Sequence, residues 1–150
     1  MVRIGYDKKF SENDISNFLN TFEISIIEGS KDLIEDFEYV EIETKILSQR
    51  GFCCLGNLIE IRNNNININQ YKCIPIRNKL VEIRNMYQQD IKNWMNFINS
   101  FVKKYKSIAI NRYYPDVKIN NGIIIKKLDE LKKEDLLTLD INQTILISLY

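Results

Sequence analysis

NKLVEIRNMYQQDIKNWMNFINSFVKKY, residues 78–105, is the stretch that decides the fold. Its apolar residues recur at spacings of three and four, which is the period of a helix with one buried side. Lysines gather at its carboxyl end, where positive charge complements the helix dipole. The stretch predicts a long helix from about residue 78 to 105, whose apolar stripe consists of Leu80, Ile83, Tyr87, Ile91, Trp94, Ile98, Phe101 and Tyr105.

The segment before this helix indicates a β-hairpin. Residues 40–46 alternate between apolar side chains on one face and charged side chains on the other. Residues 55–61 carry a matching apolar pattern after the turn signal Arg50-Gly51. We therefore expect these two strands to pair, with Val40 opposite Ile61.

Three further segments are typical of strands. Residues 117–127 contain the hairpin signature Asn121-Gly122, which favours a type I′ turn with positive φ. The apolar run at residues 144–150 predicts a strand buried on both faces. Residues 71–77 predict an edge strand, because Pro75 has no amide donor, and this edge could serve a homodimer.

The amino-terminal part begins with a helix signal. Ser11 precedes apolar residues at helical spacing, which predicts a capped helix over residues 12–22. A short strand is expected at residues 25–27. Residues 29–32 then indicate a turn, followed by a helical turn at residues 33–36.

Together these elements predict an α+β fold in a single globular domain spanning residues 1–150. A mainly antiparallel sheet of about five to seven strands is expected, with hairpins turning at Arg50-Gly51 and Asn121-Gly122. The sheet should pack against the long helix and one or two shorter helices.

The composition narrows the possible chemistry. The chain has 150 residues and no histidine, which excludes Ser-His-Asp and Cys-His catalysis and every histidine-containing metal site. With only 5 glycines, it also shows no phosphate-binding glycine motif. We therefore expect no cofactor and no metal site.

The cysteines and the apolar runs indicate the compartment. Cys53 and Cys54 are adjacent, a spacing that rarely allows a relaxed disulfide, and Cys73 leaves an odd total. No apolar run is long enough for a secretory signal or a membrane span. The expected location is the reducing cytoplasm, without membrane contact, and the three thiols are expected to be structural.

The net charge of +1 conceals a strong segregation along the chain. Residues 1–60 hold 6 basic and 12 acidic side chains, residues 61–127 hold 13 and 3, and residues 128–150 hold 2 and 5. Such polarity arises when the parts neutralise each other in the fold, or when separate charged faces meet partners.

The leading functional hypothesis is a small protein-binding module. Its most concrete form is an immunity or inhibitor protein that neutralises a partner, such as a basic toxin or nuclease domain, through a charged surface. The candidate surface is the acidic face of the first predicted hairpin, which carries Glu38, Glu41, Glu43 and Glu60. Carboxylates directly opposite one another must face water or a basic partner.

Two alternatives remain open at this point. The first is nucleic-acid binding by the basic segment 61–127, where cations would contact phosphates and aromatic rings would stack on bases. The second is an enzyme that uses carboxylates or a bound metal, but the E-x-K match at Glu43-Thr44-Lys45 has no preceding aspartate at a suitable distance, so a non-enzymatic role is favoured. The candidate phosphate contacts are Arg62, Lys72, Arg77, Lys79 and Arg84.

Overall fold

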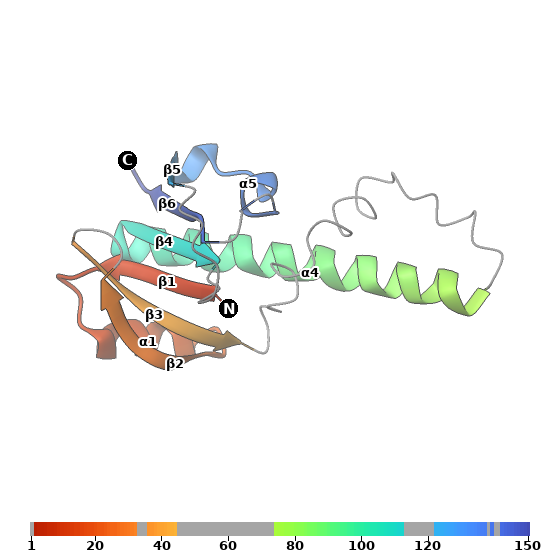
Figure 1. Cartoon of the computed structure of the whole chain (residues 1–150), viewed down its shortest axis with the longest axis horizontal. Coiled ribbons are helices and arrows are strands. Elements are labelled where there is room, and N and C mark those ends of the chain that lie inside the picture. Colours follow the sequence, from red (N-terminus) through yellow and green to blue (C-terminus); the bar gives the residue numbers. More distant parts are fainter. Residues whose placement is uncertain (1, 33–35, 45–73, 113–121, 138, 140–141) are drawn as a thin grey trace.

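A computed structural model describes residues 2–32, 36–44, 74–112, 122–137, 139 and 142–150. For residues 30–32, 44, 74–87 and 137 it describes the backbone alone. Within these ranges, six strands form one mixed sheet in the order β2-β3-β1-β4-β6-β5, in which the β5–β6 pair is parallel and the other described pairs are antiparallel (Figure 1). The strands are β1 (Val2–Asp7), β2 (Ile24–Asp32), β3 (Phe37–Thr44), β4 (Ser107–Arg112), β5 (Ile123–Lys127) and β6 (Thr144–Ser148).

The described helices are α1 (Glu12–Asn20), α4 (Ile74–Tyr105), the 3₁₀ turn η2 (Leu128–Glu130) and α5 (Lys133–Leu137). The carboxyl-terminal half of α4 lies along the sheet, and its amino-terminal half extends beyond the sheet (Figure 1). The predicted α+β fold is confirmed, including the number of strands and the long helix. No helix in the described ranges has both the length and the apolar character needed to cross a membrane.

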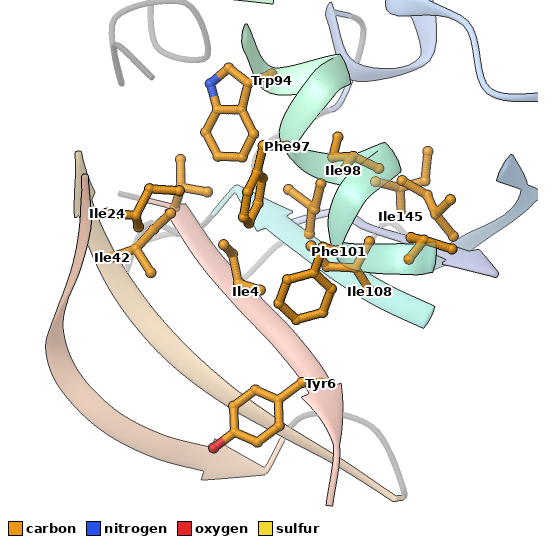
Figure 2. Packing of buried hydrophobic residues seen from close by; sticks show 14 of the residues in the cluster. Ile4, Tyr6, Ile24, Ile42, Trp94, Phe97, Ile98, Phe101, Ile108 and Ile145 are labelled. Atoms are coloured by element: carbon orange, nitrogen blue, oxygen red, sulfur yellow. The ribbon is translucent and has the colours of Figure 1, made fainter. Parts of the chain in front are cut away.

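The core lies between α4 and one face of the sheet. Trp94, Phe97, Ile98 and Phe101 are fully buried or nearly so, and the rings of Phe97 and Phe101 extend from α4 toward Ile4 of the sheet (Figure 2). Ring contacts continue along α4: Trp94 meets Phe97 edge to face at 6.0 Å between centroids, and Phe97–Phe101 and Phe101–Tyr105 pack in tilted pairs. The apolar stripe predicted for the long helix is therefore confirmed from Ile91 onward.

Helix α1 forms where the capping signal predicts it. The Ser11 side chain accepts a hydrogen bond from the Asp14 backbone N–H at 3.2 Å, which satisfies one of the free donors of the first turn. Ile15 and Leu19 bury one side of the helix. It ends at Asn20, two residues before the predicted end, because Thr21 already caps it.

The predicted partner of β3 is wrong. Both edges of β3 are occupied, by β1 on one side and β2 on the other, so Val40 lies opposite Ile4 rather than Ile61. The alternation within β3 was informative about its faces, but a period of two carries no information about which strand pairs with it. The turn Arg50-Gly51 lies outside the described residues.

Two local predictions are also wrong. Residues 29–32 belong to β2, where two register shifts replace the expected turn. Residues 74–77 begin α4 rather than forming an edge strand, because Pro75 is well tolerated in the first turn of a helix, where its missing N–H has no partner to lose. Residues 74–77 are therefore not an edge strand that could pair with a second copy, and residues 71–73 lie outside the described residues.

The carboxyl-terminal strand is confirmed as β6 over Thr144–Ser148, between β4 and β5. Ile145 and Ile147 are fully buried on the side facing the helix, while Leu146 is half-buried on the other side. Gly122 has φ of 76°, the sign that the predicted Asn121-Gly122 turn requires. The partner strand of that hairpin lies outside the described residues.

Candidate functional site

The structure gives different environments to the three described carboxylates that the sequence assigned to one acidic surface. Glu43 is exposed, Glu38 is half-buried, and Glu41 is only 8% exposed. Glu60 lies outside the described residues. Glu38 accepts a hydrogen bond from the Tyr6 hydroxyl at 3.1 Å. A continuous surface built from these residues is therefore absent from the described part of β3.

Glu41 faces a basic group of its own chain. In the register of the sheet it lies directly opposite Arg3 of β1, which is itself only 5% exposed. The next strand places Asn111 opposite Arg3, and β6 places Thr144 opposite Asn111. These buried polar residues form a row across four strands, on the face of the sheet directed away from α4. Glu41 therefore has a cross-strand neighbour of opposite charge within its own sheet.

Two buried side-chain atoms on this face of the sheet have no hydrogen-bond partner among the described residues. The Asn111 amide donates to the Thr144 hydroxyl at 3.0 Å, but its own Oδ1 accepts nothing. The Tyr39 hydroxyl on the same face is also unsatisfied. Burial raises the pKa of the Tyr39 phenol, and the nearby Thr144 hydroxyl offsets part of that rise. Arg3, Glu41, Asn111 and Thr144 are all at most 8% exposed, so this polar face is not an accessible surface site.

The exposed negative charge lies instead around α1 and the edge strand β2. Every exposed charged side chain that the structure describes on α1, β2 and β3 is a carboxylate. Glu12 on α1 lies close to β2, because a Cβ atom placed on Gly29 would be 3.9 Å from the Glu12 Oε2 atom. Glu23, in the turn between α1 and β2, is also exposed, and we call the combined set the acidic surface: Glu12, Asp14, Glu23, Glu28 and Glu43.

A shallow groove of about 340 Å³ lies beside the acidic surface, between α1 and the end of α4. The Tyr105 hydroxyl donates to the Asp14 backbone carbonyl at 3.2 Å and ties the two helices together. The Lys104 ammonium lies 5.1 Å from the centre of the Phe18 ring and 5.4 Å from that of Tyr105. The lining residues are Asp14, Asn17, Phe18, Thr21, Lys104 and Tyr105.

Sequence reasoning missed this groove, although half of it has a sequence signal. Asp14, Asn17, Phe18 and Thr21 follow one another at helical spacing and so share a flank of α1. The other wall comes from Lys104 and Tyr105, far along the chain, and no local pattern predicts that the two helices meet there.

The candidate nucleic-acid contacts fall mostly outside what the structure describes in detail. Arg62 and Lys72 lie outside the described residues, while Arg77, Lys79 and Arg84 lie on the amino-terminal half of α4, of which only the backbone is described. Among the described residues, no group of three acidic or cysteine side chains could hold a metal ion.

Comparisons with known proteins gave no match to a family model, a curated protein or a solved structure.

Proposed function

We propose that this chain is a protein-binding module that neutralises a basic partner protein through the acidic surface on α1, β2 and β3. The observation that carries the proposal is the uniform sign of the exposed charge described on these three elements. Its concrete form is an immunity or inhibitor-type protein of the cytoplasm, acting on a cationic domain such as a toxin or nuclease. No catalytic step is part of the proposal.

The physical basis is electrostatic steering. Several exposed carboxylates on a rigid helix and the adjacent strands create a negative potential that attracts a cationic surface before contact. This attraction is screened over roughly 8–10 Å at physiological salt. The association rate should therefore fall steeply as salt is added, while the dissociation rate changes much less.

The partner can be captured by site-specific photocrosslinking. A photoreactive amino acid replaces Ser25, an exposed neutral residue of β2, in the full chain expressed in its native cells. The matched control carries the same group at Asp129, which is exposed on η2. A basic protein crosslinked from position 25 and not from 129 supports the proposal. A nucleic acid crosslinked instead supports the alternative function.

The captured partner then tests the surface itself. Glu23, Glu28 and Glu43 are all exposed, and their joint replacement by lysine reverses the charge without removing a core contact. Glu12 is left unchanged, because a carboxylate in the first turn stabilises α1. We expect binding measured by calorimetry to weaken at least ~100-fold. Each factor of ten in Kd corresponds to about 1.4 kcal/mol of binding free energy. Unchanged affinity in a folded variant would refute the surface assignment.

A matched variant controls for net charge. Asp129 and Glu130 are exposed on η2, away from the acidic surface. Their replacement by lysine alters the total charge in the same direction, and we expect less than ~3-fold change in affinity.

A further inference from the structure

We propose that the groove between α1 and the end of α4 receives an arginine side chain of the basic partner, which serves as the anchor of the complex. This inference rests on the proposed function, and it adds the chemistry of one contact. The groove volume of about 340 Å³ is close to the lower limit for a ligand pocket, so it suits one side chain rather than a cofactor.

The aromatic floor of the groove already accepts a cation. Lys104 places its ammonium over Phe18 and Tyr105, at distances where the negative ring faces attract positive charge. Lys104 is exposed on a flexible side chain, so an arriving cation can replace it by rotation of that side chain. Phe18 is half-buried and Tyr105 is only 3% exposed, so the part of the floor that an arriving cation can reach belongs mainly to Phe18.

The wall of the groove supplies a carboxylate. Within the described residues, the hydrogen bonds of Asp14 use its backbone N–H and C=O, and none engages its side-chain carboxylate. Asn17 adds an exposed amide oxygen as a second acceptor from the same flank of α1. The hydrogen bond from Tyr105 to the Asp14 backbone carbonyl fixes the part of α1 that carries both acceptors relative to α4.

Arginine fits this combination better than lysine or an acidic group. A planar guanidinium can stack on an aromatic face and donate two parallel hydrogen bonds to a carboxylate at the same time. A lysine would bring the same point charge that Lys104 already provides. An acidic side chain could pair with Lys104 but would be repelled by Asp14. Arginine is also among the residues most enriched at interface hot spots.

The test uses the ¹⁵N-labelled full chain and N-acetyl-arginine amide as the probe. We expect saturable shifts in the amide signals of Asn17, Phe18, Thr21 and Lys104, with a Kd on the order of 10 mM. N-acetyl-lysine amide of equal charge is the matched ligand and should bind at least ~5-fold more weakly. Absence of saturable shifts at about 50 mM, or an equal response to both probes, would overturn the proposal.

Three variants locate the contact. Asp14→Asn keeps the shape of the wall and removes its charge, so arginine binding should fall at least ~10-fold. Lys104→Gln removes the competing ammonium and should tighten binding ~3-fold, which a purely structural role of Lys104 would not produce. The control Asp129→Asn should change nothing. Arginine binding that is unaffected by Asp14→Asn would show that the groove is not the site.

The partner complex separates this inference from the proposed function. If charge reversal of Glu23, Glu28 and Glu43 abolishes the complex while Asp14→Asn leaves its affinity unchanged, the surface assignment holds and the anchor is wrong. If the charge reversal has no effect while the arginine probe binds as expected, the proposed function is wrong and the groove chemistry holds.

Discussion

The ring of Tyr39 lies directly over Gly5, its partner on the neighbouring strand. A Cβ atom on Gly5 would be 2.8 Å from two carbons of that ring and 2.9 Å from the Cβ of Ala109. The absence of a side chain at Gly5 is therefore what allows the buried tyrosine to cross β1.

Gly5→Ala should destabilise the protein. The new methyl group would contact a buried ring on one side and Ala109 on the other, and overpacking of this kind costs about 1–3 kcal/mol. The free energy of unfolding in urea measures the effect. Gly29→Ala is the matched control, because only the Glu12 carboxylate lies near that position, and its effect should stay within about 0.5 kcal/mol. Equal stability of the two variants would contradict the packing of Tyr39 on Gly5.

Tyr39→Phe should leave stability unchanged or raise it. The Tyr39 hydroxyl is buried without a well-placed partner, and a buried polar group left unpaired costs about 1–3 kcal/mol. Removing the oxygen retains the ring over Gly5. A loss of more than about 1 kcal/mol in urea unfolding would show that the hydroxyl is hydrogen-bonded.

Unfolding at alkaline pH should also test the burial of the tyrosine phenols. Burial raises the pKa of both Tyr6 and Tyr39, and the Glu38 carboxylate adds to the rise at Tyr6. A phenol whose pKa is higher in the folded state than in the unfolded state contributes less to stability once the pH exceeds its unfolded-state pKa of about 10. Stability should therefore fall above this pH, and it should fall less in a Tyr6→Phe/Tyr39→Phe variant. Because the lysines titrate in both proteins, the difference between them isolates the two phenols. Parallel losses in the two proteins would contradict the burial of the phenols.

Ser11→Ala should remove the cap of α1. The side chain accepts from the Asp14 N–H, and losing such a cap costs about 1 kcal/mol. Thermal unfolding measures the loss, and Ser11→Asp is expected to restore most of it because aspartate also caps well. Since Asp14 lines the groove, a frayed α1 should also weaken the response to N-acetyl-arginine amide.

Arg3 and Glu41 should be energetically coupled, because they lie opposite each other and both are buried. Replacing either residue leaves the other as a buried charge that has lost its cross-strand neighbour of opposite sign, so Arg3→Met and Glu41→Leu should each destabilise the fold. The double variant should be less destabilised than the two single losses combined, with a coupling energy of about 0.5–3 kcal/mol. Strict additivity in urea unfolding would show that the two charges do not interact.

Elements with a strong hydrophobic periodicity could be predicted from the sequence, but the elements against which they pair or pack could not. The stripe on α4 and the cap of α1 are local signals, so both helices follow from the sequence. The strand β1 carries an equally local signal, the alternation of Val2, Ile4 and Tyr6 with charged residues or glycine, which the sequence reading did not use. The pairing of β1 with β3 joins distant segments and depends on tertiary packing alone.

The same distinction explains the outcome for the acidic residues. Alternation correctly puts Glu41 and Glu43 on the face opposite Val40, but a pattern along one strand cannot show that Glu41 is buried opposite Arg3 while Glu43 is exposed. The groove shows the same limit, because the flank of α1 is readable and its meeting with Lys104 is not.

The position of β6 in the sheet determines the order in which β5 and β6 can detach by local unfolding. Among the described strands β5 pairs only with β6, whereas β6 also pairs with β4. Any fluctuation that frees β6 must therefore free β5 as well, while β5 can detach alone. Amide hydrogens shared between these strands should exchange at least as fast as those between β6 and β4, so this end of the sheet opens from its outer strand inward.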